Sequence, residues 1–319
     1  MKTVLLNLAL EERHKQKLEA AAPGCRFVYA PSGVLTREMA RDAEIIVGFP
    51  PADWIAGSQK LEWLQLFSAG ADAYLKPGIL APGVKLTNAT GAYGKAVSEH
   101  GLALTLTLMK KLHAYRDFQR QHAWKDAGPV TSLTDATVLV VGLGDIGLNY
   151  ARMAKALGAP RVIGVKRRPG ERPDYVDELC LTAELDRVLP EADVIFSVLP
   201  GTPDTVHFYT AQRFAAMKPS AIFVNCGRGS AVETQVLIDA LRQGQIAAAG
   251  IDVAEVEPIP AESPLWDLDN LLITSHVAGN FHLPDILEQV VNITAENLRR
   301  YLAGQPLENV VDFTTGYKK

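Results

Sequence analysis

The amino-acid sequence predicts an α/β protein that contains two doubly wound parallel sheets, each in its own domain. Two series of short apolar runs, each alternating with amphipathic stretches, support this prediction. A glycine-rich turn between an expected strand and an expected helix, at residues 142–147, supports it as well. The 319 residues are enough for two domains of ordinary size.

The first hundred residues indicate a small parallel sheet. We expect its five strands at residues 3–8, 26–30, 44–49, 61–67 and 84–88. Helices are expected at 11–22 and 36–42, and the first of them should end at the Pro23-Gly24 pair. Strands separated by helices in this way usually pair in parallel.

Residues 97–124 differ in composition from the segments around them. They contain no proline and a single glycine, Gly101, and they are rich in Leu, Ala, Met and Lys. Propensity therefore predicts one long helix here, on the order of 40 Å in length. Such a helix is long enough to connect two domains.

A second α/β series follows this helix. Strands are expected at 137–141, 161–165, 194–199, 221–225, 248–252 and 271–274. Helices are expected at 146–157 and 181–189, further helical stretches separate the later strands, and an amphipathic helix at 283–302 closes the series.

The composition excludes several classes of function. The net charge of −4 gives no long-range attraction for nucleic acid or for an anionic membrane. No apolar run approaches the roughly 20 residues that cross a bilayer. Cys25, Cys180 and Cys226 show no metal-ligand spacing, so we expect no metal site, reduced thiols and a cytoplasmic protein.

The segment VLVVGLGDIGLNYARMAKALG carries a candidate site for a dinucleotide cofactor. Gly142 permits a tight turn, Gly144 lets the backbone approach a pyrophosphate, and Gly147 lets the helix pack closely on the strand. Asp145 and Ile146 lie between these glycines, where the helix N-terminus offers N–H groups and partial positive charge to the phosphates. A purely structural turn is the alternative.

Three basic residues, Lys166, Arg167 and Arg168, follow the next expected strand. An enzyme that uses NAD usually places Asp or Glu there to accept hydrogen bonds from the ribose. A carboxylate would repel a 2′-phosphate, whereas arginine can bind one through two parallel hydrogen bonds. The sequence therefore favours NADP, with NAD possible and a solvated basic turn as the alternative.

Candidate catalytic side chains follow three consecutive strands of the second series. Arg228 follows the strand at 221–225, Asp252 and Glu257 follow the strand at 248–252, and His276 follows the strand at 271–274. Because the carboxyl ends of parallel strands meet at one edge of a sheet, we expect these residues to converge beside the cofactor.

The order of the motifs GLGDIG, NCGRGS, DVAEVEP and PLWDLDNLLITSH resembles the D-2-hydroxyacid dehydrogenase family. The spacing of Arg228, Glu257 and His276 is similar to the family's own, and the resemblance covers nearly the whole chain. It implies a Rossmann cofactor domain at residues 99–284 and a smaller flavodoxin-like substrate domain at 1–98 and 285–319. It further implies an active cleft between these domains, closure over the substrate, and a homodimer.

The resemblance also implies catalytic roles. Arg228 would bind the substrate carboxylate and polarise its carbonyl. His276 would exchange a proton with the carbonyl oxygen, and Glu257 would orient the imidazole. The resemblance also assigns to the cofactor site Pro200, Thr205, Cys226, Gly227, Asp252 and Gly279. Cys226 would lie near the nicotinamide, either as a small packed side chain or as an oxidation-sensitive thiol.

For the substrate the resemblance implies contacts from the first domain. Ser68, Ala69 and Gly70 follow the strand at 61–67 and would offer backbone N–H groups to a carboxylate. Tyr93, in GAYGKAVSEH, would face the substrate or would be a packed aromatic residue at a hinge.

The remaining titratable residues of the expected helices are assigned no chemistry. Glu99 and His100 are interpreted as structural residues at the start of the long helix. His14, His113 and His122 are interpreted as surface residues.

We therefore predict a soluble oxidoreductase that reduces a small 2-keto acid to the D-2-hydroxy acid with NADPH. One alternative is a glyoxylate or hydroxypyruvate reductase with a narrow substrate site. The other end of the substrate range is a broader enzyme for branched or aromatic keto acids. A catalytically silent protein that senses NAD(P) and binds a partner is another, although the presence of Arg228, Glu257 and His276 disfavours it.

Overall fold

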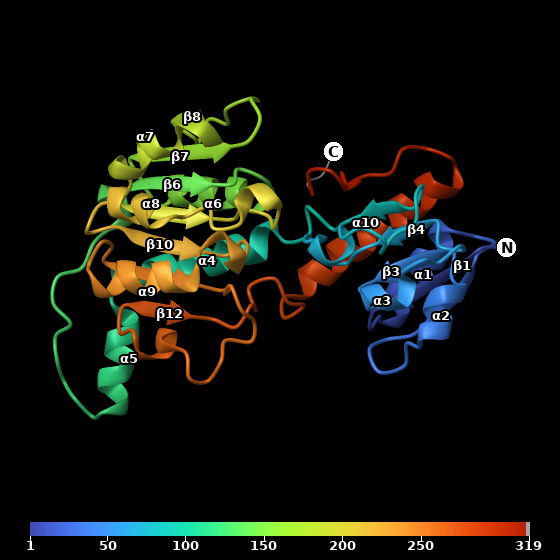
Figure 1. The fold of residues 1–319 in the computed structure, drawn as a ribbon, viewed down its shortest axis with the longest axis horizontal. Coiled ribbons are helices and arrows are strands. Elements are labelled where there is room, and N and C mark those ends of the chain that lie inside the picture. The colour runs from blue at the N-terminus through green and yellow to red at the C-terminus, as the bar shows by residue number, and fades with distance from the viewer. Residues whose placement is uncertain (317–319) are drawn as a thin grey trace. The chain divides into compact units, whose positions relative to one another are not determined.

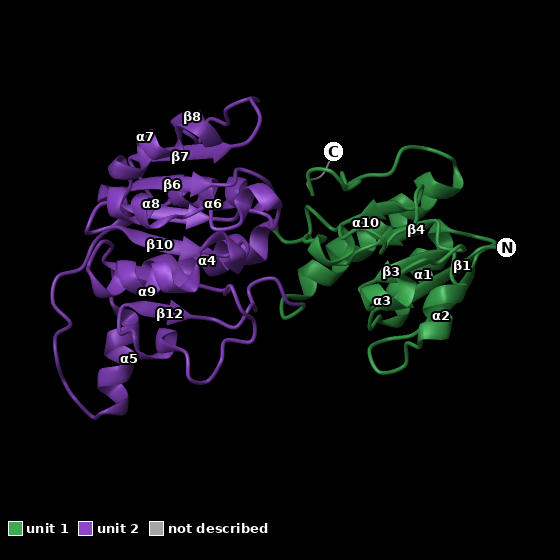
Figure 2. Cartoon of the chain, viewed as in Figure 1, with its two compact units in different colours: residues 1–93, 281–319 green, residues 94–280 purple. Residues whose placement is uncertain are grey.

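The computed structural model describes residues 1–316, and the chain divides into two compact units. Unit 1 comprises residues 1–93 and 281–319, and unit 2 comprises residues 94–280 (Figure 2). The two crossings, at 93/94 and 280/281, lie a few residues before the boundaries placed from the sequence.

Within the described residues, unit 1 is built on a five-stranded parallel sheet in the order β2-β1-β3-β4-β5. Its strands are β1 (Thr3–Asn7), β2 (Arg26–Tyr29), β3 (Ile45–Gly48), β4 (Trp63–Gln65) and β5 (Lys85–Thr87). Its helices are α1 (Glu12–Ala21), α2 (Arg37–Asp42), α3 (Ala52–Ile55) and α10 (Pro284–Leu302), shown in Figure 1. The predicted small parallel sheet is confirmed.

The middle strands of unit 1 are largely apolar and buried, as strands covered on both faces are. In β1, Leu5 packs into one core cluster, while Val4 and Leu6 pack into the other. Successive side chains of a strand point to opposite faces, so each face receives alternate residues. The second cluster includes residues of α1 and α10, and these two helices therefore cover that face.

His14 was interpreted as a surface residue, and this interpretation is wrong. Its side chain is buried, and its Nε2 lies 2.8 Å from Oε1 of Glu288 on α10. Nδ1 accepts a hydrogen bond from the backbone N–H of Glu11, so Nε2 carries the proton and donates it to Glu288. His14 thus joins α1 to α10 inside unit 1.

Unit 2 contains a seven-stranded parallel sheet, within the described residues, in the order β12-β11-β10-β9-β6-β7-β8. Its strands are β6 (Thr137–Val141), β7 (Arg161–Lys166), β8 (Glu178–Leu181), β9 (Val194–Ser197), β10 (Ile222–Asn225), β11 (Ala248–Ile251) and β12 (Leu271–Ile273). Its helices are α4 (Gly94–Met109), α5 (Leu112–Arg120), α6 (Asp145–Ala156), α7 (Leu185–Val188), α8 (Ala211–Ala216) and α9 (Thr234–Arg242). The predicted doubly wound fold is confirmed.

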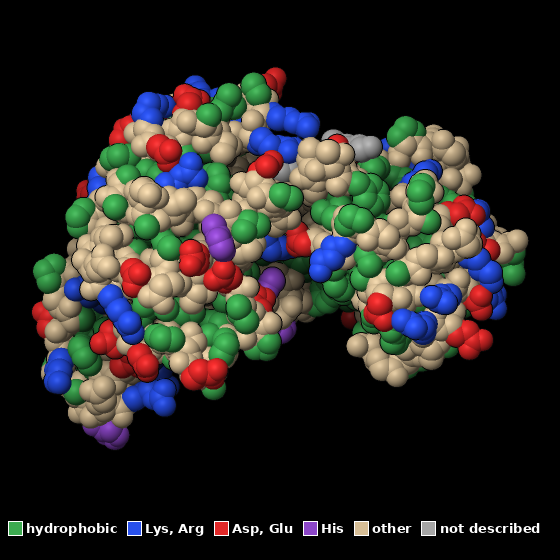
Figure 3. Space-filling view, viewed as in Figure 1, with side chains coloured by type: hydrophobic (Ala, Val, Ile, Leu, Met, Phe, Trp, Pro, Cys, Tyr) green, Lys and Arg blue, Asp and Glu red, His purple; other side chains and the backbone are tan. Residues whose placement is uncertain are grey.

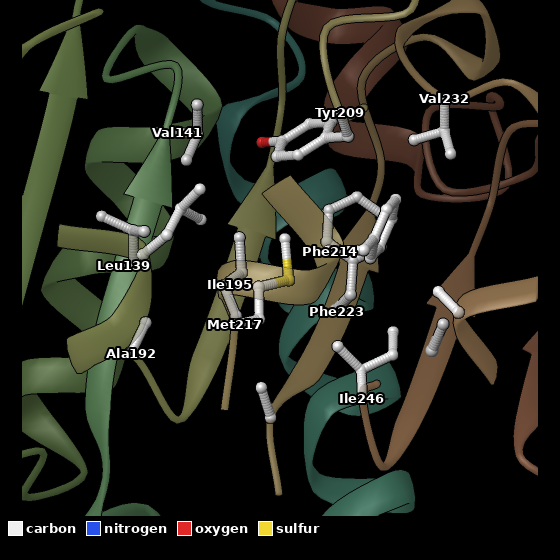
Figure 4. Close-up of a cluster of buried hydrophobic side chains, with 14 of the residues drawn as sticks. Leu139, Val141, Ala192, Ile195, Tyr209, Phe214, Met217, Phe223, Val232 and Ile246 are labelled. Atoms are coloured by element: carbon white, nitrogen blue, oxygen red, sulfur yellow. The ribbon is translucent and has the colours of Figure 1, made fainter. Parts of the chain in front are cut away.

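The largest part of the unit 2 core packs against the middle strands of this sheet. Figure 4 shows Ile195 of β9 and Phe223 of β10 beside Tyr209, Phe214 and Met217. The rings of Tyr209 and Phe223 pack edge to face with their centroids 4.8 Å apart, and those of Phe214 and Phe223 do so with centroids 5.3 Å apart. Dense packing of this kind keeps the strand ends rigid where the loops leave the sheet.

The prediction of a single long helix at residues 97–124 is wrong, because the chain forms α4 and α5 with a break between them. Lys111 adopts a left-handed backbone with φ 53°. The Nζ groups of Lys110 and Lys111 donate to the carbonyls of Thr131 and Ala127, at 2.7 and 2.8 Å. The burial of α4 against the sheet ends here, and α5 has no buried residue.

No helix in the described part of the chain, residues 1–316, has the length and apolar character needed to span a membrane. The same residues contain no cluster of three or more His, Cys, Asp or Glu side chains that could hold a metal ion.

Candidate active site

The glycine turn after β6 has the shape that each of its glycines predicted. Gly142 has φ 103°, and a Cβ there would lie 2.8 Å from the Val198 carbonyl oxygen. A Cβ at Gly147 would lie 2.1 Å from the Gly142 carbonyl oxygen, so only glycine lets α6 pack this closely on β6. At Gly144, the residue before α6, a Cβ would meet nothing within 4 Å.

This turn fits a dinucleotide cofactor. The open side at Gly144 gives a phosphate room to approach the first turn of α6. N–H groups of a first helical turn have no acceptor within the helix, and the helix dipole adds partial positive charge. β6 also lies between β7 and β9, at the point where the strand order reverses.

The basic residues occupy the end of the neighbouring strand. Lys166 is the last residue of β7, and both it and Arg167 are half-buried, whereas Arg168 is exposed. Figure 3 shows Lys and Arg side chains gathered over the β7–β8 end of unit 2. The cluster therefore lies one strand away from the glycine turn, about 5 Å along the sheet edge.

Arg228 is held at the end of β10 by a compact turn. The buried side chain of Asn225 accepts from the Gly227 N–H at 3.1 Å and donates to the Arg228 carbonyl at 3.1 Å. Nη1 of Arg228 donates to the Gly227 carbonyl at 3.0 Å, and the side chain is half-buried. The turn fixes the start of a long cationic side chain that otherwise has many rotamers.

His276 and Glu257 form a pair at the end of β12. Nδ1 of His276 lies 2.7 Å from Oε2 of Glu257, and the other carboxylate oxygen accepts from the Ala254 N–H at 2.9 Å. A carboxylate only accepts hydrogen bonds, so Nδ1 carries the proton and Nε2 is the atom left to exchange one with a ligand. His276 also has a left-handed backbone with φ 53°, which is uncommon for a residue with a side chain.

The structure brings these two groups to one edge of the sheet. β10, β11 and β12 are parallel neighbours, with Asn225, Ile251 and Ile273 in register. Arg228 and His276 each lie three residues beyond the registered position of their strand. The two strands are two steps apart, about 10 Å, so both side chains start from the same part of this edge.

Asp252, predicted as a cofactor contact, holds the loop that follows β12. Its side chain is only 2% exposed, and both carboxylate oxygens accept hydrogen bonds from residues 274–278. A carboxylate whose oxygens are occupied in this way organises its own loop, and its contact with the cofactor stays a prediction.

The turn after β9 is closed by its own side chains. The Thr205 hydroxyl donates to the Pro200 carbonyl at 2.6 Å and accepts from the Thr202 N–H at 3.0 Å. Thr205 is buried, so its side chain shapes the turn, while Pro200 stays half-buried at the sheet edge.

Cys226, Gly227 and Gly279 complete the predicted cofactor set. The Cys226 thiol is buried, and burial raises its pKa, which favours the small packed side chain over the oxidation-sensitive thiol. At Gly227 a Cβ would lie 2.6 Å from the backbone of Leu199, so this turn packs directly on the turn after β9. Gly279 lies in a turn closed by the bond from the Asn280 N–H to the Val277 carbonyl, at 3.2 Å.

The predicted substrate loop lies in unit 1, after β4. The Ser68 hydroxyl donates to the Gly70 carbonyl at 2.7 Å, and the Asn88 side chain donates to the Ala69 carbonyl at 2.7 Å. Both bonds use carbonyl groups of the turn and leave its N–H groups for an anion such as a carboxylate.

Tyr93 does not present its hydroxyl as expected of a residue facing a ligand. The side chain is buried, its hydroxyl donates to the Phe67 carbonyl, and burial raises its pKa. In unit 1 it therefore supports the turn that follows Phe67. This is the packed role that the sequence left open as an alternative.

Comparison with known proteins agrees with this geometry. The sequence profile described as "D-isomer specific 2-hydroxyacid dehydrogenase, NAD binding domain" matches residues 102–278, more than half of the chain. The chain belongs to the D-isomer specific 2-hydroxyacid dehydrogenase family. Its matched residues span the glycine turn, Arg228, Glu257 and His276.

Three similar proteins illustrate the range of this dehydrogenase family. A member from Aeromonas salmonicida of known structure is 36% identical, with a TM-score of 0.86 over 98% of this chain and 99% of that one. A family member from Xanthobacter autotrophicus, crystallised with NADPH and MES, is 30% identical, with a TM-score of 0.84 over 99% of each chain. Glyoxylate/hydroxypyruvate reductase B of Citrobacter koseri is 32% identical over 79% of this chain and 78% of its own.

Two features of this dehydrogenase were missed from the sequence. Asn225 lies within the NCGRGS motif as the last residue of β10, and an amide at the end of a strand is a known signal for a side-chain-stabilised turn. Thr274 and His100 contact one another at 2.9 Å across 174 positions of sequence, and no local pattern indicates such a pair.

Proposed function

We propose that this chain reduces a small 2-keto acid to the D-2-hydroxy acid with NADPH. The observation that carries the proposal is the Glu257–His276 pair at 2.7 Å, which leaves Nε2 of His276 available at the same sheet edge as Arg228. Membership of the 2-hydroxyacid dehydrogenase family supports the reaction class. The D configuration of the product is taken from the family.

His276 acts as the proton donor in reduction. Its Nε2–H donates to the carbonyl oxygen of the substrate as negative charge develops there, and the same atom accepts the proton in the reverse direction. Glu257 stabilises the imidazolium form and keeps the ring in one orientation. When bound, the nicotinamide of the cofactor supplies the hydride that reduces the carbonyl carbon.

Arg228 binds the carboxylate of the substrate and polarises the adjacent carbonyl group. Its planar guanidinium offers two parallel N–H donors, which suit a carboxylate. The Asn225 turn fixes where the side chain begins. Removing the Arg228 guanidinium, which is the partner of the substrate carboxylate, should cost about 1.5–3 kcal/mol of transition-state binding. This corresponds to a roughly 10- to 150-fold lower kcat/KM.

NADP preference rests on the cluster formed by Lys166, Arg167 and Arg168. Lys166 ends β7 and the two arginines follow it, where an acidic residue would otherwise bind the ribose of NAD. The Xanthobacter relative that was crystallised with NADPH supports the same preference. Binding of NADH remains compatible with the glycine turn, which contacts the phosphates that the two cofactors share.

The decisive experiment follows loss of nicotinamide absorbance with NADPH and with NADH, using glyoxylate, hydroxypyruvate, pyruvate, 2-ketoisocaproate and phenylpyruvate. We expect turnover with at least tenfold preference for NADPH, a difference of about 1.4 kcal/mol. Turnover with NADH alone would retain the dehydrogenase and refute the role of the basic cluster. Cofactor binding without turnover of any keto acid would favour the NAD(P)-sensing protein instead.

Matched variants locate the cofactor preference. The double variant Arg167→Ser with Arg168→Ser should raise the KM for NADPH at least tenfold and change the KM for NADH less than twofold. Arg242→Ser removes a like charge from an exposed position at the end of α9, and it should leave both values unchanged.

A narrower function, reduction of glyoxylate and hydroxypyruvate, is a second candidate. The Citrobacter relative, a glyoxylate/hydroxypyruvate reductase, favours it. In the panel above, kcat/KM for glyoxylate and hydroxypyruvate should then exceed that for phenylpyruvate by a factor of a hundred or more. Similar values for the small and the aromatic substrates would exclude this narrower function.

A further inference from the structure

The loop that carries His276 is organised around one buried carboxylate. Asp252 follows β11, and its Oδ1 accepts from the Thr274 hydroxyl at 2.6 Å and from the Val277 N–H at 3.0 Å. Its Oδ2 accepts from the Ala278 N–H at 3.1 Å. The backbone carbonyl of Asp252 also accepts from the His276 N–H at 2.7 Å. These bonds hold the loop on both sides of His276, whose left-handed backbone is otherwise unfavourable.

His100 on α4 extends this network, and the hydrogen positions can be worked out from it. Nε2 of His100 lies 2.9 Å from the Thr274 hydroxyl oxygen. The single proton of that hydroxyl is donated to Asp252, because an ionised carboxylate only accepts. Nε2 of His100 must therefore carry a proton and donate it to Thr274. The same nitrogen lies 3.6 Å from Oδ1 of Asp252, so a positive charge on His100 would also face this carboxylate.

The position of His100 along the chain gives this contact a second consequence. α4 begins at Gly94, the first residue of unit 2, and Thr274 lies six residues before Asn280, the last residue of unit 2. The His100–Thr274 bond therefore joins the segment by which the chain enters unit 2 to the segment by which it leaves.

We propose that His100 is a positioning residue, which acts through Thr274 and Asp252 to fix the His276 loop for proton transfer. This role rests on the proposed function for its catalytic consequence, but the contact itself does not. Neutral His100 is sufficient, since the Nε2–H donor is present in that form as well. The side chain is partly exposed, and it touches neither the proposed substrate groups nor the glycine turn in any bond of the described residues.

Two pairs of variants test the proposal through activity. His100→Ala and Thr274→Val each break the chain of hydrogen bonds, and each should lower kcat about five- to twentyfold with KM for NADPH changed less than twofold. His100→Gln and Thr274→Ser keep a donor or a hydroxyl at a similar place, and each should return kcat to within threefold of the unaltered enzyme. The double variant His100→Ala with Thr274→Val should be no slower than the slower single variant, because both act through one network.

A second measurement does not depend on activity. Hydrogen–deuterium exchange of the peptide spanning residues 274–280 reports the Val277 and Ala278 N–H groups that Asp252 holds. We expect exchange at least tenfold faster in His100→Ala and in Thr274→Val, and unchanged exchange in His100→Gln. His282→Ala, at an exposed position outside unit 2, is the matched control and should change neither exchange nor kcat.

The outcomes separate the two proposals. Unchanged exchange and unchanged kcat in His100→Ala would overturn the positioning role. Faster exchange with unchanged kcat, or a loss of kcat that His100→Gln does not restore, would also overturn it. If the unaltered protein turned over no keto acid, the proposed function would fail, and the exchange data alone would still establish or refute the contact.

Discussion

Replacing Glu257 by glutamine preserves the size of the side chain and removes one hydrogen-bond acceptor. The carboxylate now serves two donors, with Oε1 bound to the Ala254 N–H at 2.9 Å and Oε2 bound to Nδ1–H of His276 at 2.7 Å. A glutamine amide has one oxygen that accepts and one nitrogen that only donates. One of the two donors must therefore lose its partner, or the imidazole must move its proton to Nε2.

The size of the effect follows from these contacts. A hydrogen bond to a charged group contributes about 1.5–3 kcal/mol. The side chains of His276 and Glu257 are 49% and 38% exposed, so water partly replaces the lost bond and the lower value applies. A loss of about 1.5 kcal/mol in the transition state corresponds to a roughly tenfold lower kcat.

The assay is the steady-state reduction of the best keto acid of the panel, with NADPH saturating, for Glu257→Gln and the unaltered enzyme. KM for NADPH should change less than twofold, because Glu257 lies four strands along the sheet from the basic cluster. Glu262→Gln, at an exposed position in the same loop region, is the control and should keep full activity. If kcat of Glu257→Gln stayed within twofold of the value for the unaltered enzyme, the assignment of His276 as a proton donor that Glu257 orients would be refuted.

Three further predictions concern stability. Gly147→Ala places a carbon 2.1 Å from the Gly142 carbonyl oxygen. The overpacking should lower the free energy of unfolding by about 1–3 kcal/mol, which a lower Tm would show. An unchanged Tm would contradict the packing described. Glu178 lies between two arginines, which lower its pKa from 4.5 to about 2, so its contribution to stability is present above pH 4.5 and is lost as the pH falls toward 2. The Tm difference between the unaltered protein and Glu178→Gln should therefore shrink over that acid range, and a constant difference would show that the ion pairs contribute nothing. Tyr93→Phe removes the hydroxyl that donates to the Phe67 carbonyl and should cost about 1 kcal/mol of stability in denaturant unfolding, while no loss would show that water replaces this bond.

The parallel sheets could be predicted because strands that are buried on both faces consist almost entirely of apolar residues. Runs such as Thr137–Val141 and Ile222–Asn225 are apolar almost throughout, which half-exposed strands are not. The glycine turn could also be predicted, since each glycine answers a local steric demand of the backbone. Both features depend on residues that are close in sequence.

Features that depend on distant contacts could not be predicted. Propensity favours helix on both sides of Lys111, and only the end of the tertiary contacts of α4 causes the break there. β8 has four residues, a single buried side chain and a charged first position, and such an edge strand gives a weak signal. The hydrogen bonds of Asp252 to residues 274–278 could not be predicted either, because these partners lie more than twenty residues further along the chain.

The strand order of unit 2 has a consequence for how this enzyme can diverge or be redesigned. The basic cluster lies at the end of β7 and His276 follows β12, and four strands lie between β7 and β12 in the sheet. At about 4.8 Å per step, the loop to which we assign the choice of cofactor and the loop to which we assign the acid–base chemistry are on the order of 24 Å apart. Substitutions at such a distance usually contribute independently. Cofactor preference and keto-acid chemistry should therefore behave as two separate modules, each open to change by replacing one loop while the other keeps its properties.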